Sequence, residues 1–195
     1  VMLVGLAMGA TVSIAQATGR GAKKDASAAI GNTVTLFMSL SVVLLFVLLV
    51  LRGSIVSVMS TPEEAVSGTL DYLTICFIGI PFITAYNIIA SIFRGLGDSK
   101  SPMYFIAVAC VVNIALDYYF MGTLRLGPAG AALGTTLSQA VSVVISLAVI
   151  RKKQPIAVRR ADLHPCRSVM EKLLKIGVPV ALQDGFIQVS FVIIT

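Results

Sequence analysis

The sequence predicts an all-α membrane protein, a polytopic bundle of transmembrane helices. Of its 195 residues, 57% are hydrophobic and only 12% are charged, and the mean hydropathy is +0.94. This composition leaves too few charged side chains to cover the surface of a water-soluble domain. The apolar residues also form long segments, and 34–51, 72–93 and 126–150 contain no charge at all. Helices of about 20 residues, rising about 1.5 Å per residue, cross a hydrocarbon core of about 30 Å.

The apolar segments divide the chain into six expected membrane helices. We expect them at about residues 1–18, 34–51, 66–93, 103–121, 128–150 and 176–195. Residues 25–33 are expected to form an amphipathic approach to the second helix, and residues 151–175 to form a basic loop.

The positive charges indicate which gaps between the helices face the cytoplasm. Lys and Arg number three in residues 19–25, two in 94–100 and eight in 151–175, against one Arg in each of the alternate gaps. Cytoplasmic loops are enriched in these residues. We therefore expect 19–33, 94–101 and 151–175 to be cytoplasmic.

Small residues recur every four positions in two of the expected helices. The first helix carries four on one face, at Gly5, Gly9, Ser13 and Ala17. Such a face lets another helix approach closely, although a generic lipid-facing helix is the alternative. Gly130 and Gly134 form a similar pair, which we expect to pack against the helix that bears Asp117.

Proline residues inside two apolar segments predict bends. Pro81 and Pro179 each remove a backbone donor and free a carbonyl group. Polar side chains follow both positions: Tyr86 and Asn87 after the first, Gln183 and Asp184 after the second. The cluster after Pro81 can line a cavity or can hydrogen-bond between helices, and the sequence favours neither interpretation. Asp184 can be a second coupling site or part of a satisfied polar patch, and these alternatives are equally open.

The most informative polar residues lie in the segment 103–121. Asn113 and Asp117 are four residues apart, so a helix places both on one face. A carboxylate inside a membrane helix is costly and normally faces the bundle interior or a water-filled cavity. There it can exchange a proton or hold a cation. An interfacial Asp beside Tyr118 and Tyr119 is the simpler alternative, but the amide one turn deeper favours a functional site.

The sequence offers little for catalysis or metal binding. The single His164 and the three cysteines, Cys76, Cys110 and Cys166, are scattered and lack the spacing of a metal site or a disulfide framework. The chain shows no Ser/His/Asp set and no phosphate loop. We therefore expect neither an enzyme nor a cofactor, no nucleic-acid partner, and an ion gradient as the energy source.

Several motifs together resemble those of the multidrug and toxic compound extrusion (MATE) transporters. They are Gly9-Ala10 with Gln16, Asn87, Arg94-Gly95-Leu96-Gly97-Asp98 with Pro102, Asn113 with Asp117, Gly127-Pro128-Ala129-Gly130-Ala131-Ala132 with Thr135, and Gly177-Val178-Pro179. The resemblance runs through essentially the whole chain. It implies an internal fragment of a twelve-helix, two-lobe protein: most of the first lobe over 1–150, an inter-lobe loop over 151–175, and the start of the second lobe over 176–195.

Resemblance to the DinF-like branch of this family implies a cation-coupling network in the first lobe. Its members match Asn113, Asp117, Thr135 and Asn87 here. In the NorM-like branch an acid serves the second lobe, but this chain has Ile187 and Gln188 near that place. We therefore expect coupling through Asp117.

The implied function is export of small organic cations or amphipathic compounds in exchange for H⁺ or Na⁺, by alternating access across the cell membrane. The full-length protein is expected to be monomeric, with Tyr86, Gln183 and Asp184 as further candidates for the substrate cavity. One alternative is a flippase of lipids or lipid-linked oligosaccharides from the same superfamily, which usually has basic cavity residues, whereas the spans here contain no Lys or Arg. A channel, which needs a continuous polar stripe, and a non-transporting membrane scaffold are the others.

Overall fold

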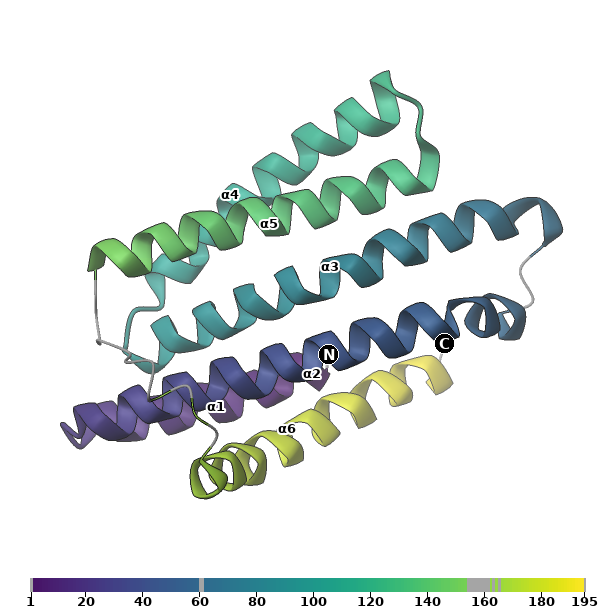
Figure 1. The fold of residues 1–195 in the computed structure, drawn as a ribbon. Helices are drawn as coiled ribbons and strands as arrows, with labels where there is room; N and C mark the ends of the chain where they lie inside the picture. Colours follow the sequence, from purple (N-terminus) through teal and green to yellow (C-terminus); the bar gives the residue numbers. More distant parts are fainter. Residues whose placement is uncertain (1, 60–61, 154–161, 163, 165, 195) are drawn as a thin grey trace. The chain divides into compact units, whose positions relative to one another are not determined.

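The structure is a computed structural model that describes residues 2–59, 62–153, 162, 164 and 166–194, except for the side chains of 2–4, 63, 64, 153, 184, 189 and 192–194. The described chain is helical almost throughout (Figure 1). In order, its elements are α1 (Met2–Gly19), α2 (Lys23–Val58), α3 (Glu63–Gly95), α4 (Lys100–Asp117), the π-helix η1 (Tyr118–Thr123), α5 (Gly127–Lys153) and α6 (Arg167–Ile194).

Four helical segments of the described chain are long and apolar enough to cross a membrane. They cover residues 23–58, 65–95, 100–123 and 127–152, and each has between 24 and 36 residues. That length exceeds the roughly 20 residues needed to cross the hydrocarbon core. The predicted fold class, a polytopic bundle of membrane helices, is confirmed.

Two helices extend beyond the apolar segments from which they were predicted. α2 begins at Lys23 and continues through Arg52 to Val58, so the expected approach segment is part of the same helix. α6 begins at Arg167, within the stretch expected to be a loop. Residues 167–176 contain no Gly or Pro, so the helix can begin before the apolar run does.

The connection between α3 and α4 is a tight glycine turn. Gly97 has a φ of +87°, a conformation that glycine adopts without steric cost. Asp98 then caps α4, because its carboxylate accepts the Ser101 N–H at 3.0 Å and the Ser101 hydroxyl at 2.7 Å. This cap satisfies a backbone donor at the start of α4.

Helices α2 and α3 each contribute to two compact units. The first unit comprises Val1–Phe37, Asn87–Pro102 and Ala148–Thr195, and the second comprises Met38–Tyr86 and Met103–Leu147. α1 and α6 therefore lie in the first unit, whereas most of α4 and α5 lies in the second.

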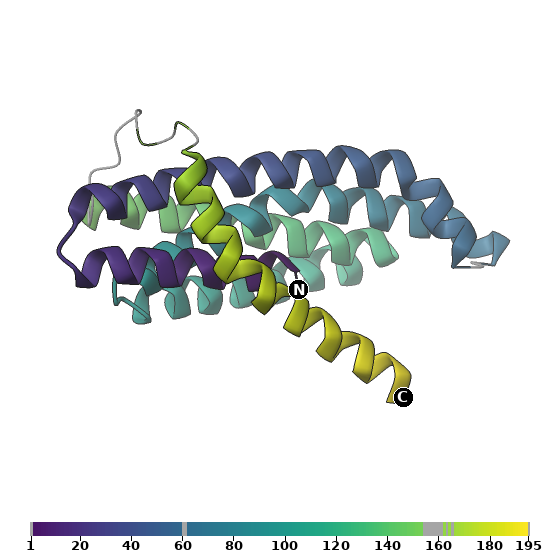
Figure 2. The ribbon, with the colours of Figure 1, turned by 90° about the horizontal axis from the view of Figure 1, so that it is seen from below.

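In the first unit, α1 and α6 cross at small residues (Figure 2). A Cβ on Gly5 would lie 2.5 Å from the Cα of Ala181, and one on Gly9 would lie 2.7 Å from the backbone nitrogen of Gly177. No side chain fits in these gaps. The predicted packing role of the small-residue face of α1 is confirmed, and its partner is α6.

The start of α6 is also tied to α2 by hydrogen bonds. The buried Asn32 accepts the Cys166 N–H at 2.6 Å through its Oδ1. The hydroxyl of Ser27 donates to a carboxylate oxygen of Asp162 at 2.6 Å. Two polar side chains near the start of α2 therefore hold the chain just before α6.

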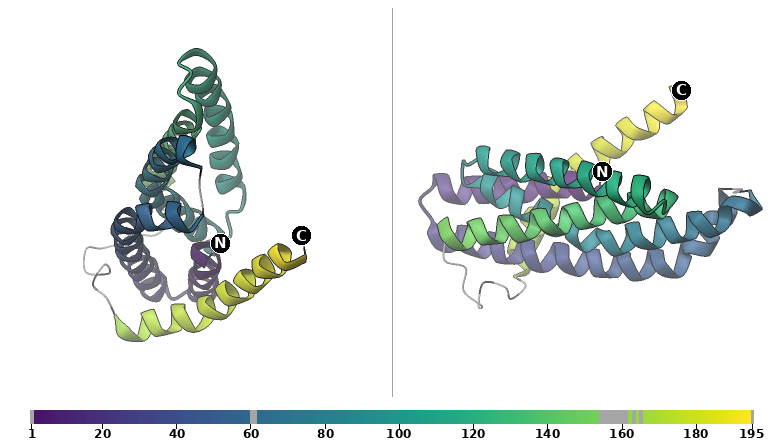
Figure 3. Two further views of the ribbon diagram at one scale, coloured as in Figure 1. Left: turned by 90° about the vertical axis from the view of Figure 1, so that its right-hand side faces the viewer. Right: turned by 90° about the horizontal axis from the view of Figure 1, so that it is seen from above.

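In the second unit, α4 and α5 lie side by side, joined by η1 and a short turn (Figures 1 and 3). A Cβ on Gly130 would lie 3.2 Å from the Cβ of Phe120, and one on Gly134 would lie 3.2 Å from the Cγ of Asp117. The close contact predicted between this glycine pair and the helix bearing Asp117 is confirmed.

Candidate functional site

Asn113, Asp117 and Thr135 meet between α4 and α5 in the second unit. The Nδ2 of Asn113 donates to Oδ1 of Asp117 and to Oγ1 of Thr135, both at 3.5 Å. These distances are long for hydrogen bonds, so each contact is weak. Three of the four residues predicted for the coupling network are therefore neighbours, and both α4 side chains are only partly exposed.

The carboxylate of Asp117 lies directly on the backbone of α5. Its Oδ1 lies so close to Gly134 that a Cβ at that position would clash with it, and the backbone nitrogen of Asp117 would be 3.4 Å from this Cβ. Any side chain at position 134 would displace the carboxylate or separate the helices. Gly134 thus fixes the position of Asp117, which is the close backbone approach that a glycine permits.

The helix changes its winding immediately after the carboxylate. η1 begins at Tyr118, and the N–H of Leu124 donates to the carbonyl of Tyr119, five residues earlier, at 3.0 Å. Short π-helical turns occur frequently at functional sites. Sequence reasoning expected a regular helix to residue 121 and missed this change, because no residue type marks a π-turn.

A cavity of about 250 Å³ lies between α4 and α5, with a side chain of α3 in its wall. Its lining residues are Tyr86, Ile106, Ala109, Cys110, Asn113, Thr135, Ser138, Gln139 and Ser142. On both α4 and α5 they recur at intervals of three and four, so each helix presents one face. At about 30 Å³ per water molecule, the space can hold several waters or a small polar group.

Hydrogen bonds between hydroxyl groups and carbonyls fix the helices around this cavity. Ser142 donates to the carbonyl of Phe105 at 3.2 Å, which joins α5 to α4. Thr136 donates to the carbonyl of Ile75 at 3.4 Å, which joins α5 to α3. Most of the residues that line the cavity are polar, none of them is charged, and Asp117 is not among them.

The remaining residues predicted for ion coupling or the substrate cavity lie on α3 and α6, in the first unit. Asn87 lies on α3 in the first unit, where its backbone carbonyl accepts the Ser91 hydroxyl at 2.7 Å. Gln183 and Pro179 line a mostly apolar hollow along α6. Asp184 is in α6, but its side chain lies outside the described residues. The roles assigned to these residues stay predictions.

Pro81 and Pro179 both lie inside continuous helices. α3 extends on either side of Pro81, and α6 extends on either side of Pro179. Proline is tolerated within membrane helices where neighbouring groups satisfy the freed carbonyl. The bends expected at these two positions stay predictions.

Three polar residues in the cavity wall were not predicted from the sequence. Ser138, Gln139 and Ser142 line the cavity with Thr135, but only Thr135 was predicted. The signal was present, because these four positions share one face of a helix. A polar stripe on a helix rich in small residues also fits ordinary helix packing, so this spacing alone does not predict a cavity.

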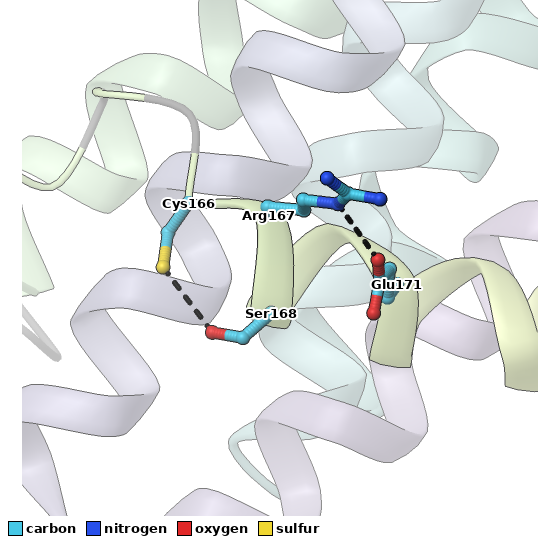
Figure 4. Close-up of polar contacts among 4 residues, drawn as sticks. All are labelled: Cys166, Arg167, Ser168 and Glu171. Atoms are coloured by element: carbon cyan, nitrogen blue, oxygen red, sulfur yellow. Dashed lines mark hydrogen bonds and ion pairs between the residues drawn. The ribbon is translucent and has the colours of Figure 1, made fainter.

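The start of α6 carries an exposed thiol (Figure 4). The Sγ of Cys166 lies 3.3 Å from the hydroxyl of Ser168, and Arg167 pairs with Glu171 at 3.0 Å. The Ser168 hydroxyl, and then the backbone N–H of Val169, lower the pKa of the Cys166 thiol because they favour the thiolate.

The chain is similar to a known protein family and to curated proteins. The family model described as MatE matches residues 1–119. The probable multidrug resistance protein YoeA of Bacillus subtilis (strain 168) is 31% identical over 96% of the chain and 42% of its own length. The probable multidrug resistance protein YpnP of the same organism is 39% identical over 64% of the chain and 28% of its own length.

A solved structure agrees with these relatives. An inward-facing multidrug resistance MATE family transporter of the MOP superfamily superimposes with a TM-score of 0.87 at 27% identity, covering 93% of the chain and 42% of that protein. The chain thus spans less than half the length of these relatives. A family match over more than half of the chain, with the same helical fold, identifies it as a member of the MatE family of membrane transporters.

Proposed function

We propose that this chain carries the ion-coupling part of a multidrug efflux antiporter. Such a protein exports small organic cations or amphipathic compounds in exchange for H⁺ or Na⁺. The observation that carries the proposal is the contact of Asn113, Asp117 and Thr135 beside a polar cavity within membrane helices. An acid inside membrane helices is costly to bury, so its presence favours a role in ion or substrate movement.

The geometry supports separate binding sites for the substrate and the coupling ion. The cavity, with Tyr86 in its wall, holds the polar end of a substrate. Asp117 holds the coupling ion, because a carboxylate can bind a proton, or can bind Na⁺ together with amide and hydroxyl oxygens. Asn113 and Thr135 supply those oxygens.

Alternating access would connect the two binding events. With the site open to the outside, an ion binds at Asp117 and weakens the hold on the substrate, which then leaves. The ion-loaded protein returns to the inward-facing state, releases the ion and accepts new substrate. Each ligand shifts the balance between the two states only by its difference in affinity for them.

The test is efflux of a fluorescent organic cation from cells that express the intact protein. Asp117→Asn removes the charge and the ion site but keeps the size of the side chain. We expect ion-driven efflux to fall by about tenfold or more, since coupling free energies are typically about 1–3 kcal/mol. Asp71→Asn, on the exposed face of α3, is the matched control. Equal efflux by the Asp117 variant and the wild type would remove Asp117 from the mechanism.

A lipid or lipid-linked sugar flippase is the second candidate. Phosphate-bearing substrates require cationic partners, and none of the residues lining the cavity is Lys or Arg. The same efflux assay separates the two, because a flippase would leave the fluorescent cation inside the cell whatever residue stands at position 117.

A further inference from the structure

Asn113 is part of the cavity wall and also contacts the carboxylate of Asp117. Asp117 is not among the residues that line the cavity. Its polar contact with the wall is the 3.5 Å approach of Asn113 Nδ2 to Oδ1. A solute in the cavity can therefore contact the amide of Asn113. This amide is hydrogen-bonded to the carboxylate and so connects it to the cavity.

A side-chain amide presents a donor on one side and an acceptor on the other. An ionised carboxylate only accepts hydrogen bonds, which matches the observed contact with Nδ2. A protonated carboxyl donates instead, and a bound Na⁺ attracts oxygen. Either change favours the amide oxygen of Asn113 as the neighbour of Asp117. A rotation of the amide by half a turn about the Cβ–Cγ bond brings the oxygen there.

The carboxylate is held in place while this happens. Its Oδ1 rests against Gly134, so Asp117 cannot move closer to α5. The Nδ2 of Asn113 is also 3.5 Å from Oγ1 of Thr135. Because a hydroxyl both donates and accepts, Thr135 can stay bonded to the amide in either orientation. After the half turn the hydroxyl of Thr135 donates to the amide oxygen instead of accepting from the amide nitrogen, so this contact is kept.

We propose that Asn113 is a relay. Ion binding at Asp117 reverses the orientation of the Asn113 amide, which then presents a hydrogen-bond donor to the cavity in place of an acceptor. This inference rests on the proposed function and adds how the ion would act on the substrate. With the carboxylate ionised, the amide oxygen is available to a solute that donates, such as a protonated amine. With the ion bound, the amide nitrogen replaces it, so the cationic solute loses a partner without ever touching the ion.

Few other groups near Asp117 can titrate. Tyr118 and Tyr119 follow it on η1 and are exposed. Cys110 on α4 and Tyr86 on α3 are in the cavity wall, and α5 contributes Gly134 and Thr135, which carry no charge. Within the described part of the chain, no Lys or Arg forms an ion pair with Asp117. A pH effect on probe binding that is lost in Asp117→Asn is therefore assigned to Asp117.

The test is the pH dependence of probe binding to the intact protein in nanodiscs. Two fluorescent probes share one ring system, and one carries a protonated amine where the other carries a neutral carbonyl. For the wild type, acidification should weaken binding of the amine probe roughly tenfold, because this probe loses its hydrogen bond to the amide oxygen. Acidification should tighten binding of the carbonyl probe, which gains a hydrogen bond from the amide nitrogen. Asn113→Leu should bind both probes independently of pH, while the infrared carboxyl band shows that Asp117 still takes up its proton.

Two further variants make the outcomes distinct. Gln139→Leu also replaces an amide of the cavity wall, but one turn away from Thr135; it should weaken binding and keep the pH dependence. If Asn113→Leu binds no probe or fails to fold, Gly134→Ala replaces it, because the added methyl group displaces the carboxylate from the amide and should flatten the pH dependence.

Each result decides a different claim. The relay would be overturned if Asn113→Leu keeps the pH dependence of the wild type while Asp117→Asn loses it. Where Gly134→Ala replaces Asn113→Leu, the same result in that variant decides the question. The antiport proposal would still stand. A normal pH dependence in Asp117→Asn itself would overturn both.

Discussion

At the scale of single residues, the account depends on one acid and the groups that fix it. Asp117 and Asn113 could be predicted from the sequence because a four-residue spacing places them on one helical face. Gly134 could be predicted only as a packing residue, since nothing in the sequence shows that its missing side chain makes room for the carboxylate. The polar wall formed by Ser138, Gln139 and Ser142 was open to prediction, but it resembles ordinary packing.

Cys166 provides a residue-scale prediction about pH. Because its pKa is lowered, chiefly by the Ser168 hydroxyl, its thiolate should form at lower pH than in the unfolded chain. We expect the midpoint of the labelling rate with iodoacetamide to lie below the ordinary value of about 8.5. Ser168→Ala should raise this midpoint. Mass spectrometry over a pH series measures the labelling midpoint of Cys166 in the native and in the denatured protein. Identical midpoints for the two states would contradict the lowered pKa of the Cys166 thiol.

At the scale of helices, the apolar segments predicted the existence of the elements better than their ends. Hydrophobicity reports the part of a helix inside the membrane, so it could not show that α2 begins at Lys23 or that α6 begins at Arg167. The small-residue faces of α1 and α5 predicted close helix contacts, and the structure supplies both. The identity of the partner of α1 needed coordinates, because a small-residue face does not specify its neighbour.

The crossing of α1 and α6 gives an element-scale prediction. Gly9→Ala places a methyl group 2.7 Å from backbone atoms of α6, so the helices must separate. We expect a loss of about 1–3 kcal/mol, as for overpacked interiors, seen as a lower melting temperature of the intact protein in detergent. Gly185→Ala is the control, because that position in α6 has nothing within 4 Å. An unchanged melting temperature for Gly9→Ala would show that this crossing does not support stability.

At the scale of the whole molecule, the charges between helices predict the orientation in the membrane. The structure confirms a multi-pass helical protein, while the side on which each loop lies stays a prediction of the positive-inside rule. The division into two lobes is an expectation from the family resemblance. The chain covers 42% of the length of YoeA.

Thiol labelling tests this orientation. In the intact protein with Cys76 and Cys110 replaced by alanine, a membrane-impermeant maleimide should label Cys166 in inside-out vesicles but not in intact cells. With Cys166 also replaced, Leu124→Cys, in the exposed turn before α5, should show the opposite pattern. Labelling of both positions from the same side would mean that the predicted topology is wrong.

The central claim is that Asp117 couples an ion gradient to movement of an organic cation. Its most direct measurement uses the purified intact protein in liposomes, with an imposed H⁺ or Na⁺ gradient as the energy source. The wild type should move the cation against its own gradient, and Asp117→Asn should permit at most equilibration. Uphill transport by Asp117→Asn at the wild-type rate would contradict the account.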